Sequence, residues 1–279
     1  MNVQRIAAFS SNGEGGNPAG VVLLDQALTE ADMLRVAADV GYSETAFAVP
    51  VENAERNWRV RYFSPESEVP FCGHATIALG AALGERDGPG TYKLALNDAI
   101  ITVSAEAAGG GMTIALASPP TKSQAAVEQE TTDAMKLFGL TEEDLDGRLP
   151  PARIHGGADH FVLVLRDRAR LTTINYDLDQ GRETMRRHGL TTIMLVYVED
   201  NRNFAVRNAF ASGGVLEDPA TGAAAAAFAG YLRDCGWPHG GSFTILQGED
   251  MGARSVINVQ LSNEPGSSVR VSGNSHQIT

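Results

Sequence analysis

Two short segments of this 279-residue chain place an ionisable side chain beside a glycine and a threonine. They are residues 71–76 (FCGHAT) and residues 217–222 (EDPATG). Each opens a run of small apolar residues, 77–83 and 223–232, which predicts a buried helix. The start of a helix presents free N–H groups and a positive dipole end, so both segments are candidate sites for a carboxylate. One such start in each half predicts a duplicated fold with a single acid-base site between the halves.

Three side chains are the candidates for proton transfer. His74 follows Gly73 at the first predicted helix start, where the positive end of the dipole disfavours a second positive charge and favours a proton-accepting ring. Asp218 precedes the second helix. Glu44 enters an otherwise apolar strand, where partial desolvation suits a carboxylate to general acid-base catalysis.

Each candidate also has a purely structural interpretation. His74 is compatible with an ordinary surface or core histidine, and Glu44 with a solvated strand edge. Asp218 precedes Pro219, the usual arrangement of a helix N-cap. Cys72 is a possible nucleophile or proton carrier. The second cysteine, Cys235, follows the second helix instead of starting it, which disfavours a racemase with two thiols.

Composition restricts the class of protein. A formal net charge of −12 argues against nucleic acid or an anionic membrane as a partner. The first residues do not resemble a signal peptide, and no apolar run is long enough to span a membrane. Two cysteines form no disulfide framework, and no metal-binding spacing is visible. We therefore expect a cytoplasmic protein without a metal or a cofactor.

The order of predicted elements indicates an α+β duplication. Short strands outnumber helices in both halves, each half has one central helix, and no parallel β-α-β alternation is visible. A further amphipathic helix is predicted from Thr29, whose hydroxyl is the expected cap. The Ser-Pro-Pro-Thr segment at 118–121 is the best candidate linker. We expect domains at 1–117 and 118–279, with the last strand of the chain packing back on the first domain.

Several segments, taken together and in order, resemble the phenazine-biosynthesis PhzF-like family, whose fold is similar to that of diaminopimelate epimerase. They cover nearly the whole chain. The matching pieces are 16–22 (GNPAGVV), 43–47 (SETAF), 62–65 (YFSP), 68–70 (EVP), 72–76 (CGHAT), 217–222 (EDPATG), and the residues Gln247, Gly248, Met251, Gly252 and Ser255.

The resemblance implies two similar domains, each a rolled, mostly antiparallel, barrel-like sheet around a central helix, with the active site in the cleft between them. The acid-base glutamate of the family matches Glu44, its supporting histidine His74 and its aspartate Asp218. The substrate carboxylate is expected near the backbone of the residues that start the two helices, and Asn17 is a further candidate for substrate binding. The helix-start residues are Gly73, Thr221 and Gly222. Family members are commonly homodimers.

The sequence also departs from the family pattern. The family usually has a serine after the glycine of the second motif, and Ala223 occupies that place. We therefore expect the same type of chemistry on a different small substrate: a cofactor-independent proton shift on a carboxylate-bearing metabolite. The alternatives are a racemase or epimerase of an amino or hydroxy acid that uses Glu44 and Asp218, and a small-molecule binding protein without catalytic activity.

Overall fold

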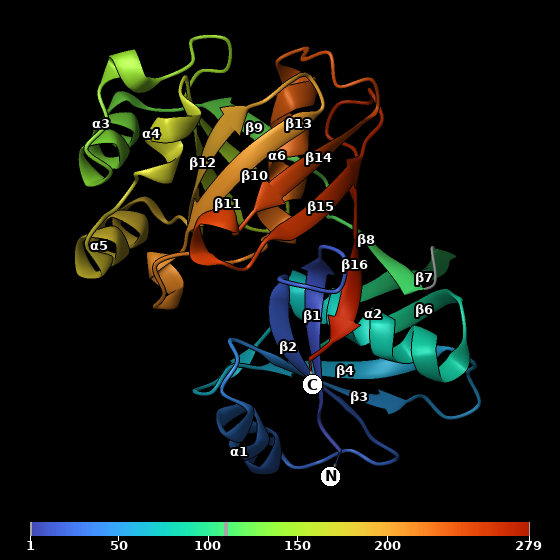
Figure 1. Ribbon diagram of the computed structural model, residues 1–279. Helices are drawn as coiled ribbons and strands as arrows, with labels where there is room; N and C mark the ends of the chain where they lie inside the picture. The colour runs from blue at the N-terminus through green and yellow to red at the C-terminus, as the bar shows by residue number, and fades with distance from the viewer. Residues whose placement is uncertain (1, 109–110, 279) are drawn as a thin grey trace. The chain divides into compact units, whose positions relative to one another are not determined.

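The computed structural model describes residues 2–108 and 111–278, and the chain divides into two compact units (Figure 1). Unit 1 comprises Met1–Ala117 and Ser272–Thr279, and unit 2 comprises Ser118–Val271. The end of the chain therefore returns to the unit in which it begins.

The elements of unit 1 are β1 (Gln4–Ser10), β2 (Asn17–Leu23), α1 (Glu30–Val40), β3 (Thr45–Pro50), β4 (Asn57–Phe63), β5 (Glu68–Val69), α2 (Gly73–Asp87), β6 (Gly90–Ala95), β7 (Ile100–Ala108) and β8 (Gly111–Ala117). Those of unit 2 are β9 (Lys122–Ala125), α3 (Glu128–Leu137), η1 (Glu142–Asp144), β10 (Ala152–His155), β11 (Asp159–Leu165), α4 (Arg168–Thr172), α5 (Leu178–His188), β12 (Thr192–Val198), β13 (Asn203–Ala209), η2 (Ala211–Gly213), α6 (Gly222–Asp234), β14 (Ser242–Gln247), η3 (Glu249–Met251) and β15 (Ser255–Gln260). The last strand, β16 (Arg270–Gln277), begins in unit 2 and continues into unit 1.

The sheet of unit 1 closes on itself around α2. Its strands follow the order β1-β2-β3-β4-β6-β7-β8, and β16 neighbours β8 and pairs antiparallel with β1. Helix α2 packs against β1, β2, β7 and β8, as Figure 1 shows, and is buried from His74 to Gly84. Small residues allow this enclosure. A Cβ atom on Gly80 would lie 2.8 Å from Val103 and 2.6 Å from Ile114, so these strands approach the helix closely.

Helix α1 covers the outer face of the same sheet. Met33 and Ala37 pack against Phe47 and Phe63 of β3 and β4. The Thr29 hydroxyl accepts a hydrogen bond from the Asp32 N–H group (3.2 Å), which confirms the predicted cap.

Unit 2 repeats this plan around α6. Its strands follow the order β15-β14-β13-β12-β11-β10-β9, and α6 packs against β9, β10, β11 and β15. A Cβ atom on Gly156 would lie 2.7 Å from the Ala227 backbone nitrogen, so the turn after β10 also needs a small residue. Helices α3, α4 and α5 form an additional layer on the other face of the sheet, over an apolar core that includes Phe161, Leu171 and Met185.

The duplication extends to strand register and side chains. The antiparallel pair β3-β4 of unit 1 corresponds to the antiparallel pair β12-β13 of unit 2. The last residue of β4, Phe63, pairs with Thr45, and the last residue of β13, Ala209, pairs with Ile193. In this register Arg61 is equivalent to Arg207. Both arginines bind a glutamate that lies four residues before the N-cap of the central helix: Arg61 binds Glu68, and Arg207 binds Glu217.

The expected α+β class, the mostly antiparallel sheets and the central helix of each half are confirmed. The expectation that no parallel β-α-β units occur was wrong. Strands β2 and β3 pair in parallel across α1, β4 and β6 across α2, β11 and β12 across α4 and α5, and β13 and β14 across α6. Helix α5 was not predicted from the sequence, because only Gly181 and Met185 of this polar helix are buried.

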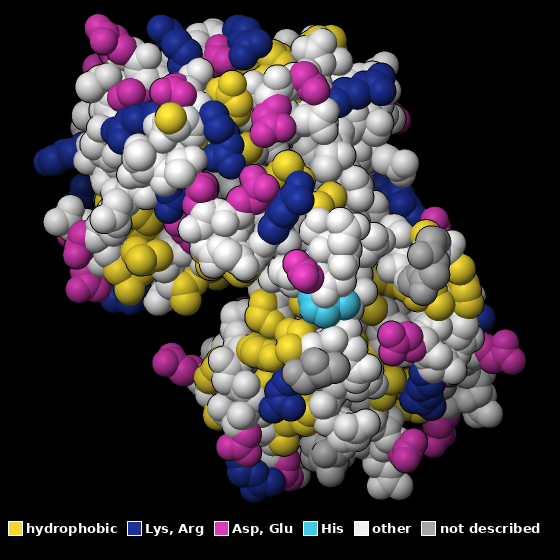
Figure 2. Space-filling model, viewed as in Figure 1, with side chains coloured by type: hydrophobic (Ala, Val, Ile, Leu, Met, Phe, Trp, Pro, Cys, Tyr) yellow, Lys and Arg dark blue, Asp and Glu magenta, His cyan; other side chains and the backbone are white. Residues whose placement is uncertain are grey.

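The described surface carries charges of both signs. On the face drawn in Figure 2, basic and acidic side chains are interspersed over each unit. None of the helices in the described part of the chain combines the length and apolarity that a membrane crossing needs.

Candidate active site

Glu44 and His74 lie side by side in unit 1. Glu44 directly precedes β3, and its carbonyl accepts a hydrogen bond from the Gly20 N–H group (3.1 Å), which fixes its backbone to β2. His74 is the second residue of α2. The Glu44 Oε2 and His74 Nε2 atoms are 3.4 Å apart, and the two side chains are only 17% and 8% exposed. This is a partly desolvated carboxylate–imidazole pair, which can exchange a proton with a substrate.

Two neighbouring side chains complete the surroundings of the imidazole. Ser43 Oγ lies 3.4 Å from Nε2, and Cys72 Sγ lies 3.4 Å from Nδ1. The ring therefore has a hydroxyl and a carboxylate at one nitrogen and a thiol at the other. Ser43 and Cys72 belong to the motifs singled out in the sequence, but only the fold shows that both contact His74.

The N-terminus of α2 is open for a ligand beside this pair. Cys72 is the N-cap residue and makes no side-chain capping bond to the helix. The first N–H groups of a helix have no intrahelical acceptor. A Cβ atom on Gly73 would meet nothing within 4 Å, so open space lies beside this peptide. These features suit a substrate carboxylate, as predicted for Gly73.

Buried hydroxyl groups hold this helix start in place. Thr76 Oγ1 donates to the Cys72 carbonyl (2.7 Å) and lies 2.6 Å from the Tyr62 hydroxyl of β4. Burial raises the pKa of Tyr62 far above its usual range, so the phenol stays protonated. Asn17, predicted to bind substrate, is the buried first residue of β2. It lies three residues before Gly20, about 10 Å along the strand.

Asp218 belongs to unit 2, where a polar network fixes it. Its carboxylate Oδ2 accepts a hydrogen bond from the Thr221 hydroxyl, and its N–H group donates to the Asn208 carbonyl (3.0 Å). Asn208 Nδ2 also donates to Thr221 Oγ1 (2.6 Å), and Gln247 Nε2 donates to the Asp218 carbonyl (2.7 Å). These contacts hold the carboxylate beside the start of α6.

The N-cap interpretation of Asp218 is wrong. Helix α6 begins at Gly222 with Thr221 as its N-cap, so Pro219 is not its first residue. A capping role therefore does not explain the Asp218 carboxylate. Thr221 and Gly222 form the helix start itself, where the sequence predicts a second carboxylate-binding backbone.

The two units differ at the position of the acid-base glutamate. When the strand pairs of the two units are matched, Thr192 is equivalent to Glu44. When the starts of α2 and α6 are matched, Ala223 is equivalent to His74. The Thr192 hydroxyl lies 2.8 Å from Nδ1 of His160, a fully buried histidine. Unit 1 therefore carries the carboxylate–imidazole pair, and unit 2 has a threonine and an alanine at the equivalent positions. The buried imidazole beside Thr192 comes from β11 and not from the central helix.

The same pair in unit 1 is part of a possible metal-ligand set. One ligand atom each from Glu44, Cys72 and His74 lie within 4.8 Å of one another. The sequence did not reveal this set, because Glu44 is distant from the other two residues along the chain and no standard metal-binding spacing relates them.

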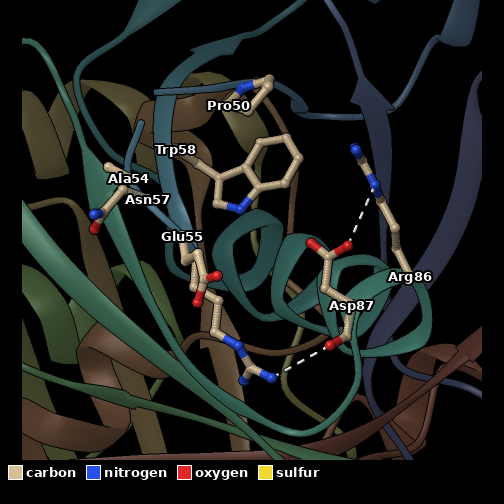
Figure 3. A pocket seen from close by; sticks show the side chains of 8 residues that line it. Pro50, Ala54, Glu55, Asn57, Trp58, Arg86 and Asp87 are labelled. Atoms are coloured by element: carbon tan, nitrogen blue, oxygen red, sulfur yellow. Dashed lines mark hydrogen bonds and ion pairs between the residues drawn. The ribbon is translucent and has the colours of Figure 1, made fainter. Parts of the chain in front are cut away.

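A separate pocket of about 340 Å³ lies at the opposite end of α2 (Figure 3). Its lining includes Trp58, Arg86 and Asp87. The Arg86 guanidinium packs over the Trp58 ring (4.9 Å) and lies 3.5 Å from the Asp87 carboxylate. Arg86 comes twelve positions after His74 in the helix, about 18 Å along the axis. The pocket is therefore not part of the Glu44–His74 site.

Comparison with known proteins shows that the chain matches one protein family over nearly its whole length. The profile of the phenazine biosynthesis-like proteins (PhzC-PhzF) matches residues 6–279. An uncharacterized isomerase of Bacillus subtilis, YfhB, is 30% identical, over 96% of this chain and 93% of its own. The trans-2,3-dihydro-3-hydroxyanthranilate isomerase of Pseudomonas chlororaphis is 26% identical, over 98% of this chain and 95% of its own.

Solved structures share the fold. A PhzF-family phenazine biosynthesis protein of Bacillus anthracis superimposes with a TM-score of 0.86 at 22% identity, over 100% of this chain and 98% of that one. A probable proline racemase of Agrobacterium radiobacter has a TM-score of 0.64 at 12% identity, over 99% and 90% of the two chains.

Proposed function

The chain belongs to the phenazine biosynthesis-like (PhzF) family and is an isomerase, and from this premise we propose that it moves a proton on a small carboxylate-bearing metabolite, with Glu44 as the acid-base group. The observation that carries this proposal is the 3.4 Å contact between Glu44 and His74 at the open start of α2. In this mechanism Glu44 removes a proton from carbon and returns it at another position.

His74 orients the substrate and hydrogen-bonds to its polar groups. The N–H groups at the start of α2 stabilise negative charge that develops on the substrate carboxylate during proton removal. Asp218 of unit 2 is the third proposed group. The network from Thr221 supports this role, since it fixes a carboxylate that does not cap its helix. The reaction needs no electron transfer, so these groups suffice without a metal or an organic cofactor.

Proton exchange with solvent tests the role of Glu44. Candidate carboxylates are incubated with the enzyme in D₂O and followed by proton NMR. The first is trans-2,3-dihydro-3-hydroxyanthranilate, the compound in the name of the Pseudomonas relative. Glu44→Gln should reduce exchange by about 10²–10⁴-fold. Glu52→Gln, at an exposed position after β3, is the matched control and should keep full exchange. A folded Glu44→Gln variant with full exchange would disprove the assignment.

The same spectra separate an isomerase from a racemase. A proton shift changes the connectivity of the product, whereas a racemase labels the stereocentre and leaves connectivity unchanged. A binding protein without activity gives a complex in calorimetry and neither exchange nor an isomerised product.

A further inference from the structure

We propose that Glu44, Cys72 and His74 form a binding site for Zn²⁺, and that an ion bound there inhibits the enzyme. The three residues belong to unit 1, and one ligand atom from each lies within 4.8 Å of the others. The metal site stands on this geometry alone. The inhibition rests on the proposed function, because it depends on Glu44 being the acid-base group.

The distances already approach those of a zinc centre. Zinc binds imidazole nitrogen at about 2.0–2.1 Å, carboxylate oxygen at about 2.0–2.2 Å and thiolate sulfur at about 2.3 Å in tetrahedral geometry. Two such ligands are then about 3.4 Å apart for nitrogen and oxygen and about 3.6 Å apart for nitrogen and sulfur. In the structure His74 Nε2 lies 3.4 Å from Glu44 Oε2 and 3.9 Å from Cys72 Sγ. The ligand atoms of Glu44 and Cys72 lie within 4.8 Å of each other. Two such ligands of one zinc ion are about 3.6 Å apart, so side-chain movements of up to about 1 Å complete the arrangement.

The charge and the types of these three ligands favour zinc over magnesium and calcium. A thiolate and a carboxylate together balance the charge of a divalent cation. Cys72 is the N-cap residue of α2, and the positive end of a helix favours the thiolate form of a cysteine. Thiolate and imidazole ligands suit zinc, whereas magnesium and calcium prefer oxygen ligands. Three protein ligands leave a fourth position for water or for an incoming carboxylate.

Occupation of this site would remove the acid-base group from the reaction. An oxygen of Glu44 that is bound to zinc cannot accept a proton from carbon, and His74 Nε2 is occupied at the same time. Zinc is therefore expected to act as an inhibitor and not as a cofactor.

Cobalt absorption tests the metal site without any substrate. Chelator-treated protein is titrated with Co²⁺, and the thiolate-to-cobalt charge-transfer band is recorded and then displaced with Zn²⁺. Cys72→Ser should lose this band and bind zinc at least about 10–100-fold more weakly, the loss expected even for a residue that only supports a ligand. Thermal unfolding checks that this variant is folded.

Cys235→Ser is the matched control, because Cys235 is an exposed cysteine of unit 2. It should keep both the band and the zinc affinity. A folded Cys72→Ser protein with an unchanged band, or loss of the band in Cys235→Ser, would overturn the site.

The inhibition is tested by deuterium exchange with and without zinc, each variant being compared with its own chelator-treated form. The wild type and Cys235→Ser should be inhibited at the same zinc concentration, and Cys72→Ser should need at least about tenfold more. Zinc that binds but leaves exchange unchanged, or increases it, would overturn the inhibition. If the wild type neither exchanges protons of any carboxylate with solvent nor converts one to an isomer, the proposed function fails, and the cobalt titration still decides the metal site.

Discussion

Arg207 holds Glu217 with two hydrogen bonds, from Nε to Oε2 (3.1 Å) and from Nη2 to Oε1. Asp218 is the next residue, so this ion pair fixes the segment that carries the third proposed catalytic group. Arg61 and Glu68 form the equivalent pair in unit 1, with an Nε–Oε1 distance of 2.7 Å. The residue after Glu68 is a valine, which has no acid-base function.

The two ion pairs provide a matched experiment. Arg207→Ala leaves the largely buried Glu217 without this cation and should lower the free energy of unfolding by about 2 kcal/mol or more in a denaturant titration. Arg61→Ala should cost less, about 1–2 kcal/mol, because Glu68 is more exposed and keeps a hydrogen bond from Asn97. Only Arg207→Ala should also reduce turnover, because it loosens the segment of Asp218. Equal effects of the two variants on turnover would show that Asp218 does not depend on this ion pair.

The Thr221 hydroxyl is predicted to position Asp218. Thr221→Val removes the donor to the Asp218 carboxylate and the acceptor of the buried Asn208 amide, which should cost about 1–3 kcal/mol of stability. Turnover should fall at the same time. Thr221→Ser keeps the hydroxyl and should restore both quantities, measured by chemical denaturation and deuterium exchange. A serine variant as impaired as the valine variant would contradict this role.

Substitution of Gly73 tests the ligand-binding end of α2. The space beside Gly73 is open, so Gly73→Ala should leave the unfolding transition unchanged while its methyl group weakens substrate binding and raises KM. Gly156→Ala is the contrasting variant, since its methyl group would meet backbone atoms of α6 at 2.7 Å and 2.9 Å. It should destabilise the protein by about 1–3 kcal/mol. An unchanged KM in Gly73→Ala would exclude this peptide from the binding site.

The buried side chain of His160 is expected to make the folded protein less stable in mild acid. Burial lowers its pKa from 6.5 to about 4, so the folded protein keeps the ring neutral while the unfolded chain binds a proton. Between these two values the unfolded state holds more protons, and stability therefore falls as the pH falls, by up to about 3 kcal/mol. Well above pH 6.5 the ring is neutral in both states and contributes no pH dependence.

Urea denaturation at pH 7 and pH 4.5 measures this effect. His160→Gln should be less sensitive to pH than the wild type over this interval, whatever its stability at pH 7. An identical pH dependence in both proteins would show that other groups cause the loss.

Local sequence patterns predicted the features that depend on neighbours along the chain. The Ala- and Gly-rich runs located the two central helices, and Thr29 located the start of α1. The parallel pairs β2-β3 and β11-β12 were missed because strand direction depends on how the chain crosses the sheet. The alternation of apolar and polar residues within a strand shows which face is buried, but not the direction of the neighbouring strand.

Within the site, the sequence indicated residue types but not contacts. The sequence identified the motifs around Glu44 and His74. Their 3.4 Å contact is visible only in the structure, because the two residues lie at the starts of separate elements, β3 and α2. The additional contact of His74 with Cys72, and the network of Thr221 with Asn208 and Gln247, are tertiary features of the same kind.

Strand β16 sets an order of events during synthesis. It is made after the strands β1 to β15, and its pairing with β1 is part of the ring that encloses α2. On the ribosome, the residues of unit 1 therefore emerge long before their barrel can be sealed. Until then an unpaired edge of β1 stays available to wrong partners, and the barrel around α2 stays open until the whole of unit 2 has been synthesised.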